Sequence, residues 1–260
     1  MSDPLRTPLH ERHLALGARM APFAGWDMPI QYGGVREEHR AVRASCGIFD
    51  VSHMGQIGVQ GPQAAPFLQT TLTNDIDALA VGDGQYTLVC TEDGGVIDDL
   101  IVYRLGEDAF LIVCNAANVA PVHTWIAGRA TPGAVVTDRS AEFAMLALQG
   151  AAWEAAFAPI ADDGPDAVLA LRYFQVVEIA LAGARSLVAR TGYTGEPGVE
   201  IMCPTNAAPA IWDALMAGPH PPVPAGLAAR DTLRLEMGYP LYGHELSLTR
   251  TPIEAGLKWA

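Results

Sequence analysis

The chain has 260 residues, half of them hydrophobic and 17% charged, a composition with enough apolar material for a substantial core. Its formal net charge is −13 and its lysines and arginines are scattered, which argues against a nucleic-acid partner because phosphate binding needs a basic footprint. The four cysteines form neither a CxxC pair nor a dense disulfide framework, so we expect reduced core thiols.

The N-terminal stretch MSDPLRTPLHERH has no apolar core of a signal peptide, and no run elsewhere is long enough to span a bilayer. We therefore expect a cytoplasmic protein with no membrane partner. The sequence HERH at residues 10–13 lacks the spacing of the HExxH zinc motif. No second ligand cluster is nearby, and no metal site is expected.

Short apolar runs of strand length alternate with alanine-rich segments of helical length, which predicts an α+β fold. The strand-like runs are GQIGVQG (55–61), YTLVC (86–90), VIDDLIVYRL (96–105), AFLIVCN (109–115), VVEIAL (176–181) and GVEIMCP (198–204). The loop GEDA joins the third run to the fourth as a β-hairpin, and such pairs are antiparallel. Most of the sheet should therefore be antiparallel.

The segment LAARDTLRLEMG, residues 227–238, has the pattern of a helix that follows a proline-rich break. Ala229, Leu233 and Met237 would share one face, and Arg230 would lie on a neighbouring face. Beyond it the chain ends at IEAGLKWA, an apolar segment that resembles a further strand and has no polar tail. We expect these residues to be the N-terminal part of a longer protein.

Two carboxylates, Asp98 and Asp99, stand inside an otherwise apolar strand. Side chains alternate across a strand, so the two should face opposite ways. The expected faces are Ile97, Asp99, Ile101 and Tyr103 on one side, and Val96, Asp98, Leu100 and Val102 on the other.

A buried carboxylate costs several kcal/mol unless it is paired or hydrogen-bonded, so at least one of these aspartates needs a partner. One interpretation is structural, with both bonding to backbone N–H groups of the preceding EDGG turn. The other is functional: Asp99, beside Tyr103 in an apolar wall, would face a flat, nitrogen-bearing ligand.

The stretch TGYTGEPGVEI, residues 191–201, also places a carboxylate inside an apolar strand, because Glu200 stands between Val199 and Ile201. A basic group should meet it. Arg230 is a candidate, since guanidinium and carboxylate form strong bidentate pairs. A ligand-binding pair and a plain structural bridge both fit this spacing.

Seven motifs together resemble those of the glycine-cleavage T-protein family, the tetrahydrofolate-dependent aminomethyltransferases. They are FAGWDMPIQY, CGIFDVSHMGQI, GGVIDDLIVY, VCNAAN, LALQG, RTGYTGEPGVEI and GLAARDTLRLEMGYPLYGHEL. They occur in the family's order and cover nearly the whole chain.

The resemblance implies an α+β folate-binding fold of two interleaved, mostly antiparallel subdomains, roughly 1–50 with 138–225 and 51–137 with 226–260. The small C-terminal β-barrel of the family would be missing. Asp99 matches the family's catalytic aspartate near folate N10, and Glu200 and Arg230 match the pair that holds the pterin. Other positions that match the lining of the folate channel are Met54, Tyr86, Tyr103, Asn115, Tyr193 and Trp259.

By the same resemblance, the lipoyl arm of the glycine-cleavage H-protein delivers an aminomethyl group to tetrahydrofolate. The products would be 5,10-methylenetetrahydrofolate, ammonia and dihydrolipoyl H-protein. Asp99 would stabilise developing positive charge and orient N10. Two alternatives remain: a related folate-dependent demethylase of a methylated amine or sulfonium compound, and a non-catalytic folate-binding factor that maintains iron-sulfur proteins. The latter group carries a KGCYxGQE-like signature where this chain has RTGYTGEPGVE.

Overall fold

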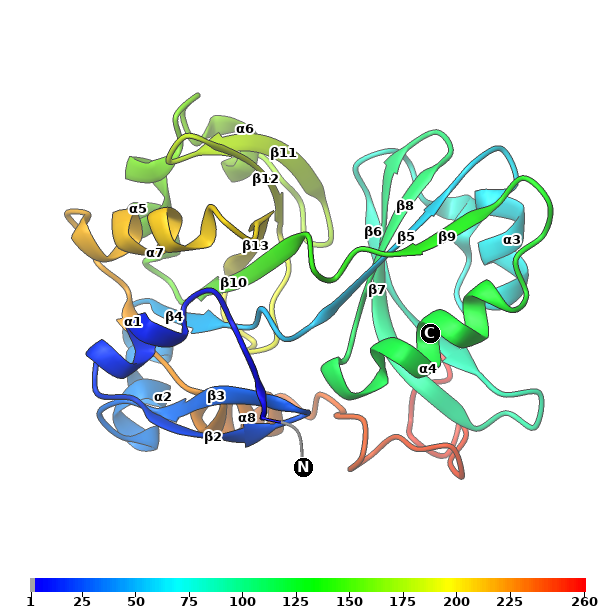
Figure 1. Cartoon of the computed structure of the whole chain (residues 1–260), viewed down its shortest axis with the longest axis horizontal. Helices are drawn as coiled ribbons and strands as arrows, with labels where there is room; N and C mark the ends of the chain where they lie inside the picture. Colours follow the sequence, from blue (N-terminus) through cyan, green and yellow to red (C-terminus); the bar gives the residue numbers. More distant parts are fainter. Residues whose placement is uncertain (1–2) are drawn as a thin grey trace. The chain divides into compact units, whose positions relative to one another are not determined.

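A computed structural model describes residues 3–260, and the chain divides in it into two compact units (Figure 1). Unit 1 contains the chain up to His53 together with Glu142–Tyr239, and unit 2 contains Met54–Ala141 with Pro240–Ala260. Each unit is thus built from two distant segments of the sequence. The helix within residues 226–239, which the resemblance assigns to the second subdomain, packs in unit 1 against α2 (Val35–Ala44) and β3 (Trp26–Gln31).

Unit 1 is built on a six-stranded sheet in the order β11-β12-β13-β10-β4-β14. Its strands are β4 (Gly47–Asp50), β10 (Phe143–Gln149), β11 (Val176–Leu181), β12 (Ala184–Ala189), β13 (Gly198–Pro204) and β14 (Val223–Pro224). All neighbouring pairs are antiparallel except β14 with β4. The strands β4, β10 and β13 are buried almost throughout, which explains their continuous apolar runs.

One face of this sheet carries the main core of unit 1. The helices that contribute to this core are α5 (Trp153–Phe157), α6 (Asp166–Leu169) and α7 (Ala208–Ala217), with the 3₁₀ turn η3 (Ala158–Ile160). The rest of unit 1 contains α1 (His10–Ala15), α2, α8 (Leu227–Glu236) and a small sheet of β1 (Leu5–Arg6), β3 and β2 (Arg19–Phe23) in that order. The predicted helix at 227–238 is therefore confirmed, although Met237 is exposed rather than on the buried face.

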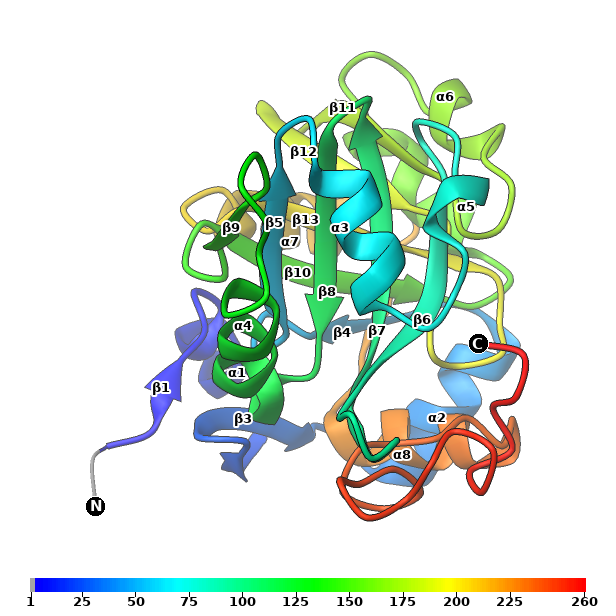
Figure 2. The ribbon, with the colours of Figure 1, turned by 90° about the vertical axis from the view of Figure 1, so that its right-hand side faces the viewer.

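Unit 2 is built on a five-stranded antiparallel sheet in the order β6-β7-β8-β5-β9. The strands are β5 (Gly55–Gln60), β6 (Gly84–Cys90), β7 (Val96–Gly106), β8 (Ala109–Cys114) and β9 (Val135–Asp138). Figure 2 shows α3 (Ala64–Thr71) and α4 (Val119–Ala127) over one face of the sheet. The short 3₁₀ turns are η1 (Ile76–Ala78) and η2 (Ala116–Asn118). The predicted hairpin is the pair β7–β8.

On the opposite face of this sheet, C-terminal residues of the chain cover part of β6 and the start of β7. Leu246 and Leu257 pack there against Leu88 of β6 and Val96 of β7. Residues 251–260 run through turns, so the expected strand at the end of the chain is wrong. Within IEAGLKWA, Leu257 packs on the sheet, whereas Ile253 and Trp259 are exposed.

An irregularity in the pairing of β6 with β7 changes the predicted faces at the start of β7. The register shifts between Val89 and Cys90, so Cys90 lies opposite Val96 and Val89 opposite Asp98. Ile97 is the extra residue, and it packs in the core with Leu100 instead of sharing the face of Asp99. The position of such a bulge cannot be recognised from the alternation of side chains along the sequence.

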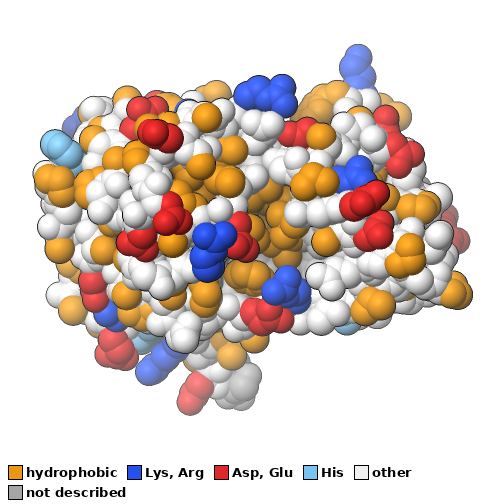
Figure 3. Space-filling view, turned by 90° about the horizontal axis from the view of Figure 1, so that it is seen from above, with side chains coloured by type: hydrophobic (Ala, Val, Ile, Leu, Met, Phe, Trp, Pro, Cys, Tyr) orange, Lys and Arg blue, Asp and Glu red, His pale blue; other side chains and the backbone are white. Residues whose placement is uncertain are grey.

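Basic side chains on the surface stand apart from one another on the face drawn in Figure 3, and they form no single patch there. This agrees with the scattered lysines and arginines of the sequence. Within residues 3–260, no helix combines the length and apolarity needed to cross a membrane.

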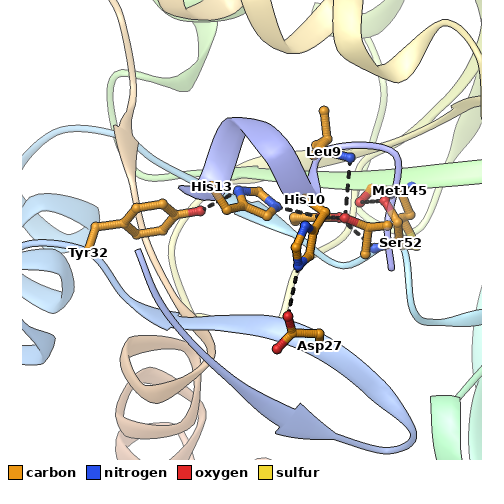
Figure 4. Close-up of polar contacts among 9 residues, drawn as sticks. Leu9, His10, His13, Asp27, Tyr32, Ser52 and Met145 are labelled. Carbon is orange, nitrogen blue, oxygen red and sulfur yellow. Dashed lines mark hydrogen bonds and ion pairs between the residues drawn. The ribbon is translucent and has the colours of Figure 1, made fainter. Parts of the chain in front are cut away.

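A buried polar cluster around Asp50 ties the N-terminal segment to the end of β4 (Figure 4). Asp50 Oδ2 accepts hydrogen bonds from Thr7 Oγ1 at 2.6 Å and from His13 Nε2 at 2.8 Å. Asp50 Oδ1 accepts the backbone N–H of Ser52 at 2.9 Å, and the Tyr32 hydroxyl lies 2.9 Å from His13 Nδ1. Both carboxylate oxygens are thereby occupied by groups of unit 1.

Candidate functional site

In unit 2, one asparagine bridges the two carboxylates of β7. Asn115 Nδ2 lies 2.9 Å from Asp98 Oδ1 and 2.9 Å from Asp99 Oδ1. The backbone N–H of Asn115 donates to Asp98 Oδ2 at 2.9 Å, and Asn118 Nδ2 donates to Asp98 Oδ1 at 2.6 Å. The Tyr86 hydroxyl donates to Asp99 Oδ2 at 3.0 Å. Asp98 therefore accepts three hydrogen bonds and Asp99 two from these side chains and this backbone group.

The end of β8 explains how one residue reaches both aspartates. Consecutive strand residues point to opposite faces, so a bridging group must lie at the strand's edge. β8 ends at Cys114, opposite Leu100, and the chain turns there into η2. Asn115 thus stands beside the edge of β7 that β8 no longer covers. The structural interpretation from sequence gave Asp98 partners in the EDGG turn, and its partners are instead Asn115 and Asn118.

The electrostatics of the pair differ from those of a surface carboxylate. Burial raises the pKa of Asp98 to about 7, the adjacent charge of Asp99 adds to the rise, and the bonds from Asn118 and Asn115 offset part of it. Burial also raises the pKa of Asp99 to about 6, against the lowering effect of Tyr86 and Asn115. Both carboxyl groups therefore exchange protons close to neutral pH, as groups in functional sites often do.

The other predicted residues of unit 2 lie around Asp99 to different extents. The Tyr86 and Trp259 rings are 5.3 Å apart at 34°, and Trp259 is 63% exposed. Tyr103 shares the face of Asp99 further along β7 and is fully buried. Met54 lies directly before β5, which is separated from β7 by β8. The structure thus brings Tyr86, Asn115 and Trp259 into the neighbourhood of Asp99. Met54 directly precedes Gly55, which pairs with Cys114, the residue before Asn115.

In unit 1, Glu200 and Arg230 form a buried but loose pair. Glu200 lies on β13 and Arg230 on α8, and their closest atoms, Glu200 Oε1 and Arg230 Nη2, are 3.8 Å apart. Thr191 Oγ1 donates to Glu200 Oε2 at 2.7 Å. The Arg230 guanidinium also lies over the Tyr193 ring, 5.0 Å from its centroid, and Tyr193 stacks on Tyr239. Three predicted residues, Tyr193, Glu200 and Arg230, therefore come together.

The loop that carries Tyr193 is held by a buried glutamine of β10. Gln149 Nε2 donates to the Thr191 carbonyl at 3.1 Å, and Gln149 Oε1 accepts from Thr194 Oγ1 at 2.9 Å. A Cβ at Gly192 would lie 1.9 Å from Gln149 Oε1, so only glycine fits beside this side chain. Gly195 has a φ of +79°, which also favours glycine. These contacts explain the glycine-rich sequence TGYTGEPG.

Two buried polar atoms of this region have no hydrogen-bond partner among the described residues. They are Arg230 Nη1 and His53 Nδ1. Burial lowers the pKa of His53 to about 4, the Asp50 charge opposes this shift, and the Arg230 cation adds to it. His53 is therefore a neutral imidazole in the surroundings of Arg230. Sequence reasoning missed it, and also Asn118, although His53 stands next to Met54 in one of the seven motifs.

The chemistry of these residues fits an organic ligand with hydrogen-bonding edges. Glu200 accepts and Arg230 donates, and a buried donor without a partner, such as Arg230 Nη1, is unusual unless a ligand or water satisfies it. No group of three or more histidine, cysteine, aspartate or glutamate side chains suited to a metal ion occurs between residues 3 and 260.

The mixed α+β architecture and its three sheets define the class as the N-terminal folate-binding fold of the aminomethyltransferases. The chain belongs to the family described as the GCVT N-terminal domain, which matches residues 9–260. Membership of this family implies the use of folate.

Individual relatives agree with this assignment. The chain is 48% identical over 260 residues to an aminomethyltransferase of Saccharopolyspora erythraea and 46% identical over 258 residues to one of Geobacillus kaustophilus. These alignments cover 99% and 98% of this chain and 70% of each relative. The crystal structure of the glycine cleavage system aminomethyltransferase T from Bartonella henselae is similar with a TM-score of 0.89 at 38% identity. That match covers 98% of this chain and 68% of the other.

Proposed function

We propose that this chain catalyses the tetrahydrofolate-dependent aminomethyl transfer of glycine cleavage. The donor would be an aminomethyl group on the lipoyl arm of the H-protein, and the products would be 5,10-methylenetetrahydrofolate, ammonia and dihydrolipoyl H-protein. The similarity to curated aminomethyltransferases supports this reaction over demethylation of an amine or sulfonium compound and over a non-catalytic iron-sulfur maintenance role. The observation that carries it is Asp99, a carboxylate held by Tyr86 and Asn115 on an apolar sheet face.

On the pterin side, Glu200 and Arg230 would bind the heterocycle as one unit. The amino and N3–H groups of a pterin are donors that suit the Glu200 carboxylate, and its carbonyl oxygen suits the Arg230 guanidinium. The distance of 3.8 Å between Glu200 and Arg230 leaves neither fully satisfied by the other. Arg230 Nη1 supplies the free donor that this binding needs. Tyr193, over which Arg230 lies, would contribute an aromatic surface.

On the reacting side, Asp99 would act as an electrostatic and positioning residue. The transfer breaks a C–S and a C–N bond of the donor and forms bonds from the same carbon to N5 and N10 of folate. A fixed carboxylate stabilises positive charge that develops at the nitrogen atoms and accepts a hydrogen bond from N10–H. Asp99 is prepared for this role because Tyr86 and Asn115 fix its orientation before the ligand arrives.

The remaining predicted residues would complete the binding surface in unit 2. Tyr86 and Trp259 offer aromatic rings close to Asp99. Tyr103, which is buried on the same face of β7, would pack beneath this surface. Asn115 has both amide hydrogens directed at the aspartates, so its carbonyl oxygen is the group left for a ligand. Met54 would act as an apolar contact from the start of β5.

The substitution Asp99→Asn tests the proposal. It keeps the shape of the side chain and removes the charge, so formation of 5,10-methylenetetrahydrofolate from aminomethylated H-protein should fall by about 10²- to 10³-fold, the effect of deleting one transition-state contact. The matched control is Asp138→Asn, an exposed aspartate on β9 of the same sheet. Equal rates for the wild type and Asp99→Asn would refute the role of Asp99.

A further inference from the structure

The geometry points to Asp98 as a positioning residue that acts on Asp99 through Asn115, so that the two aspartates work as one coupled pair. This inference rests on the proposed function, because it assigns the group that prepares Asp99 for the transfer. It concerns a residue that the resemblance leaves without a role.

The first argument is that Asp98 does not face a ligand. Its side chain has no exposed surface, and its two oxygens accept the three donors of Asn115 and Asn118. A carboxylate with this many donors is fixed in position and has little capacity for a further partner. Asp98 therefore acts within the protein.

The second argument is that Asp98 fixes the residue that orients Asp99. Asn115 is attached to Asp98 by both its backbone N–H and its side-chain amide, so its χ angles are set by Asp98. The same Nδ2 reaches Asp99 Oδ1 at 2.9 Å and the Asp99 carbonyl at 3.2 Å. A movement of Asp98 is thus transmitted to the carboxylate of Asp99 through a single amide group.

The third argument is electrostatic. Two carboxyl groups on adjacent residues, joined by one amide and buried together, disfavour simultaneous ionisation. The titratable groups that face the pair are Tyr86 from β6, Cys114 from β8 and Tyr242 from the segment after α8. None of these side chains can carry a positive charge that would compensate the pair. The charge of Asp99 raises the pKa of Asp98, so the two carboxyl groups titrate as a coupled pair.

The main test is Asp98→Asn, compared with the wild type and with Asp138→Asn. We expect kcat for aminomethyl transfer to fall by about 10- to 100-fold, as for small misplacement of a catalytic group, with KM for tetrahydrofolate unchanged. The acidic limb of the pH profile of kcat should keep its position, because Asp98 is still protonated when Asp99 ionises, so the loss is one of orientation and not of ionisation. An unchanged kcat would overturn the inference.

A second readout does not depend on catalysis. In protein labelled with ¹³C at the aspartate carboxyl groups, the Asp99 resonance is assigned by its loss in Asp99→Asn. Its titration should show two steps in the wild type, its own ionisation and that of Asp98, and only the first of them in Asp98→Asn. A single step at the same pH in both proteins would show that the aspartates are independent.

A milder variant keeps the test valid if Asp98→Asn folds poorly. Asn118→Ala removes one donor from Asp98 and keeps the backbone bond from Asn118 N–H to the Asn115 carbonyl. It should lower kcat by less than Asp98→Asn does, again without a change in KM. An unchanged kcat in Asn118→Ala would contradict the positioning of Asp99 by Asp98 through Asn115. Wild-type protein that performs no folate-dependent transfer would refute the proposed function, whereas active wild type with an unaffected Asp98→Asn would refute only the role of Asp98.

Discussion

Asp50 in unit 1 and the Asp98–Asp99 pair in unit 2 are all strand aspartates in apolar surroundings, but their environments have opposite effects. Burial alone would raise the pKa of Asp50, yet the hydrogen bond and attraction of His13, with the bonds from Ser52 and Thr7, outweigh it and hold the pKa below its usual value. Asp98 and Asp99 receive hydrogen bonds from neutral amide and hydroxyl groups. Burial therefore dominates, and their pKa values rise to about 7 and about 6.

The difference shows how partners decide between a structural and a functional role. A basic partner and a closed set of donors make the Asp50 charge part of the fold. Neutral amide and hydroxyl donors orient Asp98 and Asp99 without neutralising them, which leaves the charge of Asp99 available to a ligand that carries positive charge. Burial by itself does not separate the two cases.

The largest effect on stability is expected for Asp50→Ala. The substitution leaves His13, Thr7 and the Ser52 N–H without their acceptor, and breaking a buried pair of this kind costs about 3–5 kcal/mol in the free energy of unfolding. Urea unfolding measures it. The control is Asp213→Ala, which removes an exposed ion pair with Arg12 and should cost about 1 kcal/mol or less. Similar losses in the two variants would remove the contrast between the regions.

The second prediction concerns the pH dependence of stability. The raised pKa values mean that the folded protein holds protons on Asp98 and Asp99 that the unfolded chain releases, so their contribution is present below pH 4 and is lost as pH rises through about 6 and 7. Asp98→Asn should therefore gain stability relative to wild type between pH 4 and pH 8, by a few kcal/mol on the order expected for such shifts.

The Asp50 contribution has the opposite sign. Its lowered pKa stabilises the fold at neutral pH, and this stabilisation is lost as pH falls below about 4 through the folded-state value.

Unfolding free energies measured by urea at pH 5 and pH 8 should separate Asp98→Asn from Asp50→Ala. Across this range, only the difference in unfolding free energy between wild type and Asp98→Asn should change. A constant difference would mean that the pair titrates normally.

Glu200 is an intermediate case, since it has a cationic partner that is too distant for a full hydrogen bond. Thr191 holds one oxygen, and Arg230 stays 3.8 Å from the other. A double-mutant cycle of Glu200→Gln and Arg230→Lys, read as the dissociation constant of tetrahydrofolate by calorimetry, should give a coupling of about 0.5–3 kcal/mol. Additive effects would show that the two residues do not share the ligand.

The smallest expected effect belongs to Tyr32→Phe. This change removes one hydrogen bond, between the hydroxyl and His13 Nδ1, and should cost about 0.5–1.5 kcal/mol in unfolding free energy without altering folate binding. The control is Tyr173→Phe, because Tyr173 is 59% exposed. A loss as large as that of Asp50→Ala would show that Tyr32 contributes as much to the cluster as Asp50 does.

Local patterns in the sequence predicted several of these features. The alternation around Glu200 identified a polar residue on an apolar strand, and the i, i+4 spacing in residues 227–238 identified the helix that carries Arg230. The hairpin β7–β8 followed from a four-residue polar loop between two apolar runs. Each of these signals is contained within one short segment.

Features that depend on distant segments were not predictable in this way. The Asp50 cluster joins residues up to 43 positions apart, and Asp98 bonds to Asn118, 20 positions away. The extra residue Ile97 changes the face pattern of β7 without any change in composition. His53 reads as an ordinary motif residue until its burial and its unpartnered nitrogen are seen.

The construction of each unit from two segments has a consequence for the order of folding during synthesis. The five strands of unit 2 all lie within residues 55–138, so this sheet needs no later part of the chain. β4, by contrast, pairs with β10 and β14, so its pairing is complete only when residues up to 224 have been synthesised. Pairing between strands that are far apart in the sequence slows the formation of a sheet. Nascent chains should therefore protect the β7 aspartates within a sheet first, and gain the covering residues 240–260 last.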